Sequence, residues 1–322
     1  MLVTGGSGFI GRHVTAALRE AGAEVRVLDL VAYPDPEVET VVGDLIEPDV
    51  IAAGLEGRVD RIVHLAAVTS VLKSVEHPEL TYRTNVAATA QMLEAARQAG
   101  VSSVVFASTN AVAGPVPEGT VISEANALHP LTPYGATKAA AEMLISAYDA
   151  SYGLRGCCLR FTNVYGLGMQ AKDSIVARLM RVILGGGEFE IYGAGRQVRD
   201  YLHVGDVVAA IGKALVDDRW SGPVTLGAGA SLSVLDVLDA VRRVSGADLP
   251  ARHVPAKAGE MPAVVVDTSH ALDLGWKAEM SLEEGLAGVW AEWSARAKAG
   301  EPRAKASEPR AHTGGSGAKT EQ

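Results

Sequence analysis

The chain has 322 residues, of which 48% are hydrophobic and 35 are glycine, and its formal net charge is −9. This length and apolar content suffice for one large domain and a smaller one, and no apolar run approaches the roughly 20 residues of a membrane span. The acidic balance argues against nucleic acid as the main partner. We expect a soluble, cytoplasmic α/β protein, because the N-terminus enters a strand at once and leaves no room for a signal peptide.

The first predicted elements are a short strand, a glycine-rich turn and a helix. The apolar residues 2–4 are followed by Gly5-Gly6-Ser7-Gly8-Phe9-Ile10-Gly11, with the spacing Gly-x-x-Gly-x-x-Gly. Gly5 permits the tight turn, Gly8 lets the backbone approach a pyrophosphate, and Gly11 allows the helix to pack closely on the strand. Because a helix N-terminus carries a partial positive charge, this stretch predicts a dinucleotide-binding turn.

A second predicted strand, residues 24–29, ends in the carboxylate of Asp29, 18 residues beyond Gly11. A carboxylate at this place is suited to hydrogen-bond both hydroxyls of an adenosine ribose, and it would repel a 2′-phosphate. The pattern therefore favours NAD over NADP, although the nearby Arg26 leaves the preference open. Asp44, after a predicted strand over 40–43, is placed to meet the adenine.

Strands and helices then alternate over about 165 residues, as a parallel sheet requires. Residues 61–67 and 102–108 each predict a strand whose carboxyl end faces the ligand side of a doubly wound sheet. His64 lies at such an end, where a histidine is more often a packed, hydrogen-bonded residue than a functional one. The same topology places four residues beside the nicotinamide half of the cofactor: Ala66, Ala67, Ser108 and Thr109.

Tyr134 and Lys138 lie four residues apart in a segment with helical periodicity, so a phenol and an ammonium share one helical face. A tyrosine has an ordinary pKa near 10, and about 4 kcal/mol of preferential phenolate stabilisation is needed to make it a base at neutral pH. One positive charge about 4 Å away supplies up to about 4 kcal/mol at an effective dielectric constant of about 20. The positive charges of Lys138 and a cationic nicotinamide together supply the required free energy, which predicts Tyr134 as the base.

Cys157 and Cys158 are the two cysteines of the chain, and they are adjacent in a predicted apolar strand. Neighbouring cysteines are poor candidates for a structural disulfide. We expect two buried free thiols, and no spacing of residues suggests a metal site.

With these features in place, the chain resembles the extended short-chain dehydrogenases/reductases, and among them the nucleotide-sugar epimerase/dehydratase group typified by UDP-glucose 4-epimerase. The resemblance covers residues 1 to about 295. It rests on motifs that occur in order along the chain: Gly5-x-x-Gly8-x-x-Gly11, Asp44-Leu45, His64-Leu65-Ala66-Ala67, Asn85, Ser108-Thr109, Tyr134-x-x-x-Lys138, Arg160-Phe161-Thr162-Asn163-Val164-Tyr165-Gly166 and Arg199-Asp200-Tyr201-Leu202-His203-Val204.

The resemblance implies a Rossmann-type doubly wound parallel sheet with a smaller C-terminal α/β substrate-binding domain. Residues 1–165 would mainly bind NAD and residues 166–297 mainly the substrate, with segments allowed to interleave. The polar, proline-containing stretch 298–322 predicts a disordered tail. A homodimer is also implied, through helices near 87–99 and 136–152, with burial of that stripe inside one subunit as the alternative.

The resemblance also assigns roles to individual residues. Lys138 would hydrogen-bond the nicotinamide ribose, and Thr109 would hold the reacting sugar hydroxyl through its Oγ1. Contacts with NAD are implied for these residues: Gly5, Gly8, Phe9, Ile10, Gly11, Asp29, Asp44, Leu45, Leu65, Ala66, Ala67, Asn85, Ser108, Tyr134 and Lys138.

Five further residues match positions that line the substrate site in this family. Asn163 and Arg199 match residues that contact the diphosphate of the nucleotide sugar, and Lys257 stands where the family has a second arginine. Tyr192 lies in a stretch that flanks the base in relatives, with a packed strand residue as the equal alternative. Val264 stands where several hexose-restricted relatives have tyrosine, which leaves room for an N-acetyl group.

The residues after Thr109 help to choose the reaction. Related 4,6-dehydratases carry Asp-Glu there, whereas this chain has Asn110 and Ala111, so elimination is disfavoured. We expect an NAD-dependent nucleotide-sugar 4-epimerase that oxidises C4 transiently to a 4-keto sugar, with UDP-glucose, UDP-galactose or a modified UDP-hexose as substrate. Two alternatives stay open: a nucleotide-sugar oxidoreductase with net NAD(P)(H) turnover, and a catalytically silent protein that senses NAD.

Overall fold

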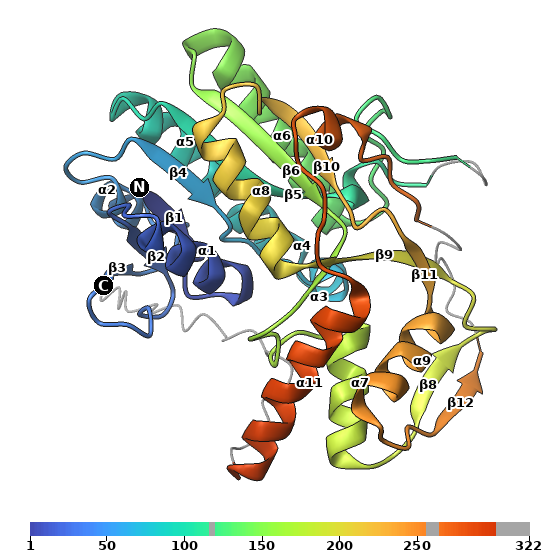
Figure 1. The fold of residues 1–322 in the computed structure, drawn as a ribbon. Coiled ribbons are helices and arrows are strands. Elements are labelled where there is room, and N and C mark those ends of the chain that lie inside the picture. Colours follow the sequence, from blue (N-terminus) through green and yellow to red (C-terminus); the bar gives the residue numbers. More distant parts are fainter. Residues whose placement is uncertain (116–119, 256–263, 301–322) are drawn as a thin grey trace, which may run out of the picture.

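A computed structural model describes residues 1–115, 120–255 and 264–300 of the chain. Its largest element is a seven-stranded sheet with the strand order β10-β6-β5-β4-β1-β2-β3 (Figure 1). Every neighbouring pair in this sheet is parallel, and the order grows outward from β1 in both directions. This is the doubly wound arrangement that the sequence predicted. The strands are β1 (Leu2–Thr4), β2 (Arg26–Asp29), β3 (Glu39–Val42), β4 (Arg61–His64), β5 (Ser103–Thr109), β6 (Arg155–Phe161) and β10 (Gly222–Leu226).

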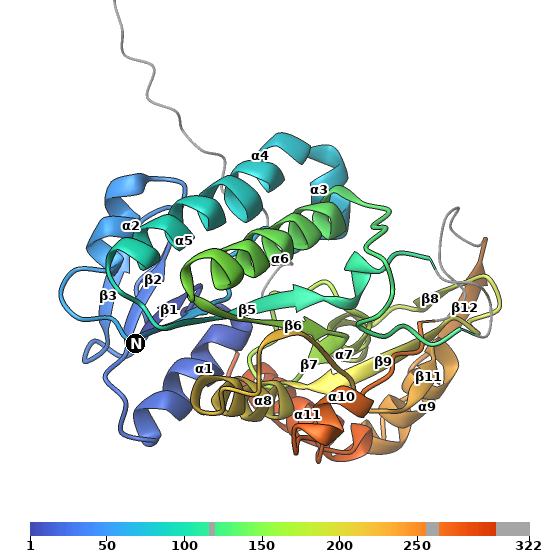
Figure 2. The same ribbon diagram turned by 90° about the horizontal axis from the view of Figure 1, so that it is seen from above.

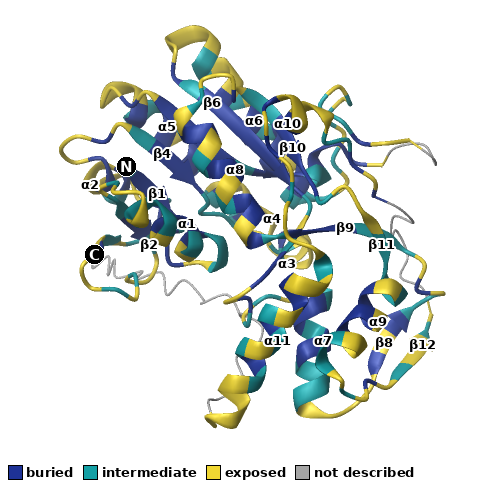
Figure 3. Ribbon diagram, in the orientation of Figure 1, coloured by how far each residue is buried: buried dark blue, intermediate teal, exposed yellow. Residues whose placement is uncertain are grey.

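Helices cover both faces of the large sheet, as Figure 2 shows. One face carries α2 (Pro48–Gly54), α5 (Ala88–Gln98) and α6 (Pro133–Tyr152), and the other carries α1 (Phe9–Glu20) and α8 (Val204–Val216). Leu2 and Val3 are adjacent in β1 but belong to the apolar clusters of opposite faces. Because side chains alternate along a strand, a sheet with two covered faces needs strands that are apolar throughout. Figure 3 shows the inner strands β1 and β6 buried, whereas the residues of the edge strand β3 are intermediate or exposed.

The ends of several elements differ from the sequence-based expectation. The strand expected over 24–29 begins at Arg26, and the helix expected over 87–99 is α5, which follows directly on a π-helical turn, η1 (Arg83–Ala87). The helix that carries Tyr134 starts at Pro133, three residues earlier than expected, because the Thr132 hydroxyl accepts the N–H of Gly135 and Pro133 suits the first turn. Tyr134 therefore lies in the first turn of α6. Four short helical segments complete this part of the chain: α3 (Val71–Glu76), α4 (Pro78–Tyr82), the 3-10 turn η2 (Asn110–Val112) and α10 (Ser269–Asp273).

Other segments of the C-terminal half form a smaller lobe beside the carboxyl edge of the sheet (Figure 1), whereas α8 and β10 belong to the large sheet and its cover. The apolar cluster of this lobe includes Met180, Leu238 and Trp293, each from a different helix. Two small sheets, β11-β9-β7 and β12-β8, frame this cluster. The elements are β7 (Asn163–Tyr165), α7 (Ile175–Gly185), β8 (Phe189–Tyr192), β9 (Val198–His203), β11 (Ser231–Ser233), α9 (Val234–Ser245), β12 (Ala251–Val254) and α11 (Leu282–Lys298).

Three further sequence-based expectations can be compared with the structure. Cys157 and Cys158 are buried free thiols in β6, as predicted. Of the predicted disordered tail, Lys298 is the last residue of α11, and residues 301–322 lie outside the described part. Among the described residues, no helix combines the length and the apolar character that crossing a membrane would require.

Candidate active site

The glycine-rich turn joins β1 to α1 and leaves the first N–H groups of that helix open. Gly8 precedes α1, and no side chain caps the helix. Gly5 has a φ of 70°, and a Cβ there would lie 2.7 Å from the backbone nitrogen of Ala66. A Cβ on Gly11 would lie 2.1 Å from the carbonyl oxygen of Gly5. Both positions therefore require glycine, and the turn presents a helix N-terminus to which an anionic group can bind.

Asp29 ends β2 against this turn. Its Oδ2 accepts the N–H of Ser7 at 3.0 Å, and its Oδ1 accepts the N–H of Val31 at 3.3 Å. Burial raises the pKa of Asp29, and these backbone hydrogen bonds oppose the rise. Arg26 is engaged away from this carboxylate, with its Nε 2.8 Å from Glu39 on β3. Arg26 therefore does not offer its guanidinium to a 2′-phosphate, which Asp29 would repel, and the geometry favours NAD over NADP.

Other predicted cofactor residues lie along the same edge of the sheet. The N–H of Leu65 donates to the Thr4 carbonyl at 3.1 Å, and that of Ala66 donates to the Thr4 hydroxyl at 3.2 Å. Asp44 follows β3, and its Oδ1 accepts the N–H of Ile46 at 3.1 Å. The other predicted members of this edge are Phe9 and Ile10 in the first turn of α1, Leu45 in the core cluster below β2, and Ala67 after β4.

A chain of buried hydrogen bonds links β1 to α6. The hydroxyl of Thr4 lies 2.6 Å from Nδ1 of His64, and Nε2 of His64 lies 3.0 Å from the Thr89 hydroxyl. Thr89 donates in turn to the carbonyl of Asn85 at 2.8 Å. Burial, with a smaller contribution from the charge of Lys138, lowers the pKa of His64 to about 3. His64 is thus a neutral, packed residue that ties the strand ends together.

Asn85 extends this chain to the helix that carries Tyr134. Its Oδ1 accepts the N–H of Val68 at 2.8 Å, while Nδ2 donates to the Val68 carbonyl and to the Thr137 hydroxyl, both at 3.0 Å. The π-helical turn η1 holds Asn85, and such turns occur frequently at functional sites. Both amide hydrogens are used within the protein, so in this structure Asn85 fixes the segment after β4 against α6.

Thr109, Tyr134 and Lys138 meet where the end of β5 faces the first turns of α6. Lys138 Nζ donates to the carbonyl of Ala107 at 2.8 Å and lies 4.5 Å from the centre of the Phe106 ring. Burial raises the pKa of Tyr134 to about 12, and a hydrogen bond with Thr109 opposes the rise. Burial also lowers the pKa of Lys138 to about 7. A further positive charge beside Tyr134 is therefore needed before the phenol can act as a base at neutral pH.

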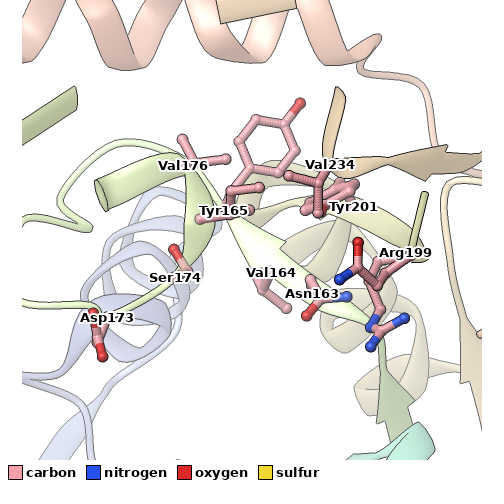
Figure 4. A pocket seen from close by; sticks show the side chains of 11 residues that line it. Asn163, Val164, Tyr165, Asp173, Ser174, Val176, Arg199, Tyr201 and Val234 are labelled. Carbon is pink, nitrogen blue, oxygen red and sulfur yellow. The ribbon is translucent and has the colours of Figure 1, made fainter. Parts of the chain in front are cut away.

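A pocket of about 270 Å³ lies between the β7–β9 pair and the N-terminus of α7. Figure 4 shows the polar ends of Asn163 and Arg199 on one side of this pocket and Ser174 with Asp173 on the other. Ser174 precedes α7 but does not cap it, and its buried hydroxyl has no hydrogen-bond partner among the described residues. An arginine, an amide, a hydroxyl and a helix N-terminus together suit a diphosphate.

Three predicted substrate residues lie elsewhere or cannot be placed. Tyr192 ends β8 in the smaller lobe and does not line this pocket. Val264 is 3% exposed and belongs to a small apolar cluster with Ala113, and its N–H donates to the Val198 carbonyl at 3.0 Å. Lys257 lies outside the described residues. Within the described ranges no group of three His, Cys, Asp or Glu side chains could hold a metal ion.

Two residues of this region were not predicted from the sequence. Ser174 stands directly before the apolar start of α7, a position typical of an N-cap serine, so its pattern suggested only a helix end. Glu142 lies one turn beyond Lys138 and buries its carboxylate behind the reaction centre. The repeat of Tyr134, Lys138 and Glu142 at intervals of four is the signal that could have identified it.

The sequence and the overall fold of this chain are similar to those of known proteins. The sequence model of the NAD dependent epimerase/dehydratase family matches residues 1–224. The UDP-glucose 4-epimerase of Thermus thermophilus, solved with NAD, is 34% identical, has a TM-score of 0.85, and is matched over 91% of this chain and 98% of that chain. The protein MoeE5, solved with NAD and either UDP-glucose or UDP-glucuronic acid, is 38% identical and has a TM-score of 0.84. The match with UDP-glucose-bound MoeE5 covers 92% of this chain and 99% of that one.

The relatives also include an enzyme of different chemistry. The dTDP-glucose 4,6-dehydratase of Streptomyces niveus is 32% identical over 312 residues, which cover 91% of this chain and 92% of that protein. Overall likeness therefore does not separate epimerisation from elimination. The residues beside Thr109 have to decide between them.

Proposed function

Because this chain belongs to the NAD-dependent epimerase/dehydratase family, we propose that it is a nucleotide-sugar 4-epimerase that acts on a UDP-hexose. The observation that carries the proposal is the meeting of Thr109, Tyr134 and Lys138, with Asn110 and Ala111 following Thr109 in η2. Neither of those two side chains exchanges a proton at neutral pH. The site therefore provides one base for one hydroxyl and lacks, next to Thr109, the carboxylates that elimination would use.

NAD is the cofactor of this family, and the residues of this chain fit it. The open N-terminus of α1 and the close approach allowed by Gly5 and Gly11 suit a pyrophosphate, and Asp29 suits the adenosine ribose. The chemistry that NAD supplies when bound is acceptance of a hydride from C4 of the sugar and its return later in the same cycle. We assign Ser108, Lys138 and the edge residues Leu65 to Ala67 to the nicotinamide side of this site.

We assign the proton transfer to Tyr134. Its pKa has to fall from about 12 to near 7, which requires about 7 kcal/mol. Two positive charges, each worth up to about 4 kcal/mol at about 4 Å, are sufficient, and Lys138 with the nicotinamide supplies them. Thr109 then holds the C4 hydroxyl while Tyr134 removes its proton, and Tyr134 returns the proton when the 4-keto sugar is reduced on its opposite face.

The pocket at α7 is proposed to hold the substrate diphosphate. Arg199 and Asn163 on one side, with the unpartnered hydroxyl of Ser174 on the other, would anchor the two phosphates. A fixed diphosphate leaves the 4-keto sugar free to turn about its bond to that group and to present either face. In this proposal residues 1–165 mainly bind NAD, residues 166–297 mainly bind the nucleotide sugar, and Lys257 adds a further positive charge.

The identity of the sugar is the next question. UDP-glucose and UDP-galactose are the first candidates, because the Thermus thermophilus relative is named a UDP-glucose 4-epimerase. A carboxylated UDP-hexose is the second, because MoeE5 is more similar in sequence and was solved with UDP-glucuronic acid. An N-acetylated UDP-hexose is the third, because Val264 is smaller than the tyrosine of several hexose-restricted relatives, although its side chain packs in the cluster with Ala113.

We further propose that the protein forms a homodimer through the outer face of α6 and its neighbours. Met143 and Tyr152 on α6 are 65% and 59% exposed, and Tyr82 at the end of α4 is 55% exposed. Exposed large apolar side chains on the neighbouring helices α4 and α6 support a protein contact on this side of the molecule. Sedimentation equilibrium would measure the assembly directly, and a monomer at micromolar concentration would contradict this proposal.

The proposed activity is tested by NMR of the purified protein with UDP-glucose, UDP-galactose, their N-acetyl forms and UDP-glucuronic acid, with no added cofactor. Interconversion of C4 epimers is expected for at least one pair. Tyr134→Phe should slow it by about a thousandfold or more, because general acid–base catalysis contributes on that order, while NAD affinity stays within about twofold. Substrate-dependent NADH formation after NAD is added, without epimer interconversion, would replace the epimerase by the oxidoreductase alternative.

A further inference from the structure

A third ionisable residue lies on the face of α6 that carries Tyr134 and Lys138. Glu142 follows Lys138 by one helical turn, and only 6% of its side chain is exposed. Its partner is Arg160 on β6, whose side chain is 4% exposed. A buried ion pair costs desolvation energy and is weak evidence for stability by itself. Its place directly behind the reaction centre therefore suggests a task other than stabilising the fold.

Three donors converge on the Glu142 carboxylate. Arg160 donates from Nη2 to Oε2 at 2.7 Å and from Nε to Oε1 at 3.1 Å. The hydroxyl of Ser108 donates to Oε1 as well. Ser108 and Arg160 are directly paired across the β5–β6 register, so one carboxylate on α6 fastens two adjacent strands. These bonds fix the orientation of the Glu142 carboxylate.

The end of β5 transmits this arrangement to the reaction centre. Ala107, Ser108 and Thr109 are consecutive residues of β5. The carbonyl of Ala107 accepts the Lys138 ammonium at 2.8 Å, Ser108 is bound to Glu142, and Thr109 is bonded to Tyr134. Each of the three ionisable residues on this face of α6 therefore contacts a different residue at the end of β5. A change at Glu142 reaches the reacting groups without touching the substrate.

Glu142 is also the carboxylate that faces Lys138 in the described structure. The other titratable or charged groups around the ammonium are Tyr134 on α6, Cys158 and Arg160 on β6, and His64 on β4. Burial raises the pKa of Cys158 and lowers that of His64, so both are uncharged near neutral pH. Burial lowers the pKa of Lys138, and charge on Cys158 and on Glu142 opposes that effect. Because Cys158 is a neutral thiol near neutral pH, the carboxylate of Glu142 is the group that acts there.

We propose that Glu142 is a positioning residue that keeps Lys138 in its ammonium form and, with Arg160, fixes the end of β5 that carries Thr109. This inference rests on the proposed function only in that Lys138 is taken to assist Tyr134. Arg160 has a second task, since its two hydrogen bonds orient the buried carboxylate. One of its nitrogens, Nη1, has no hydrogen-bond partner among the described residues, so Glu142 accounts for the side-chain bonds of this guanidinium.

The direct test is an NMR titration of Lys138 in full-length protein saturated with NAD, with lysine labelled by 13C at Cε and the resonance assigned through its loss in K138R. In E142Q the side chain keeps its size and still accepts from Ser108, but the negative charge is gone. The titration midpoint of Lys138 should fall by about one to two pH units relative to the wild type. An unchanged midpoint in E142Q would overturn the proposal.

Asp149→Asn is the matched control, because it neutralises a carboxylate on the same helix, whose side chain bonds Gly156 and Ser221 rather than the reaction centre. The Lys138 midpoint should stay within about 0.3 units of the wild type in this variant. A fall in D149N as large as that in E142Q would overturn the assignment to Glu142 in particular. It would show that Lys138 responds to the overall charge of α6.

A second variant covers the case in which E142Q does not fold. E142M/R160M replaces the buried pair by apolar side chains of similar length, a change that is often neutral or stabilising. Its Lys138 midpoint should still lie below that of the wild type, because Glu142 follows Lys138 by one turn of α6, whereas Arg160 reaches this region from β6 and its guanidinium is directed at the Glu142 carboxylate. An equal midpoint in this double variant would overturn the proposal. If a UDP-hexose is turned over, the alkaline limb of the pH profile of kcat should shift with the titration midpoint of Lys138. If no epimerase activity is found, the titration of Lys138 still tests the role of Glu142.

Discussion

The two proposed ligand-binding regions of this protein are built on different principles. The turn between β1 and α1 is a backbone site, which depends on the absence of Cβ atoms at Gly5 and Gly11 and on the open N-terminus of a helix. The pocket at α7 is a side-chain site, in which Asn163, Arg199 and Ser174 come from three separate segments. The first region tolerates almost no change, whereas in the second each side chain contributes separately.

This difference has a physical origin. A pyrophosphate held by backbone N–H groups needs a fixed chain conformation, and seven consecutive residues determine it. A diphosphate held by side chains needs only that three groups point to one place, and many sequences satisfy that condition. The regions should therefore respond differently to single substitutions: a change in the turn should damage both folding and cofactor binding, and a change in the pocket should damage binding alone.

Gly11→Ala is the change with the largest expected effect in the backbone site. The added methyl group would lie 2.1 Å from the Gly5 carbonyl and 2.6 Å from Gly6 Cα, so α1 has to shift away from β1. Such overpacking typically costs about 1–3 kcal/mol of the free energy of unfolding. NAD affinity should fall by more than about tenfold, since the helix N-terminus moves with α1. Denaturant unfolding and titration with NAD measure the two effects.

Gly212→Ala is the matched control, because a Cβ on this residue of α8 would meet no heavy atom within 4 Å. Alanine is favoured over glycine in a helix, so this variant should be as stable as the wild type or more stable by up to about 1 kcal/mol. Its NAD affinity should be unchanged. If G11A bound NAD as tightly as G212A, the turn would not be the rigid backbone site described here.

His64 is expected to make the region around the turn sensitive to acid. Its ordinary pKa of 6.5 falls to about 3 in the folded protein, first because of burial and then because of the charge of Lys138. Below pH 6.5 the unfolded chain binds a proton at this imidazole that the folded chain does not bind until about pH 3. The free energy of unfolding should therefore fall with pH across this window, by about 2 kcal/mol between pH 6.5 and pH 5.

The measurement is urea unfolding at pH 7.5, 6.5, 5.5 and 5.0 for the wild type and for His64→Asn. The variant loses the bonds to Thr4 and Thr89 and should be less stable at pH 7.5. Its stability should nevertheless depend less steeply on pH, because the proton uptake at this position is removed. Equal slopes for the two proteins would show that another group causes the acid sensitivity.

The sequence predicted the backbone site almost completely. The glycine spacing, the carboxylate of Asp29 and the alternation of strands and helices each depend on neighbouring residues, so local patterns sufficed for the turn and for the parallel, doubly wound class of the large sheet. The pair Tyr134 and Lys138 was also identifiable, because one helix sets their spacing. The structure added that the helix starts at Pro133 and that Arg26 turns away from Asp29 toward Glu39.

The side-chain regions were less predictable, because their contacts join segments far apart in the sequence. Glu142 meets Arg160 and Ser108 only after β5, β6 and α6 have packed together. The resemblance placed Asn85 beside NAD. In the structure both amide hydrogens of Asn85 are hydrogen-bonded to protein groups. Asn85 lies in a π-helical turn, which no local sequence pattern predicted. Ser174 had the pattern of a helix cap, and only the structure revealed that its hydroxyl caps nothing.

Ser174→Ala is the change that tests the side-chain site with the smallest disturbance. The hydroxyl makes no hydrogen bond with the described residues, so its removal should change the free energy of unfolding of the unliganded protein by less than about 0.5 kcal/mol. A bond to a charged phosphate is worth more, so the KM for the UDP-hexose should rise by roughly tenfold. NAD affinity should stay unchanged, because the two regions share no residue.

Ser281 provides the opposite control, because it precedes α11 as Ser174 precedes α7. Its hydroxyl does cap the helix, accepting the N–H of Glu284 at 3.3 Å in a complete capping box. Ser281→Ala should therefore lower the free energy of unfolding by about 1 kcal/mol and leave the KM unchanged. Two serines in the same local position would then show opposite profiles, since one hydroxyl is used by the fold and the other is reserved for the ligand. A stability loss in S174A equal to that in S281A, with no change in KM, would place Ser174 with the structural caps and remove it from the diphosphate site.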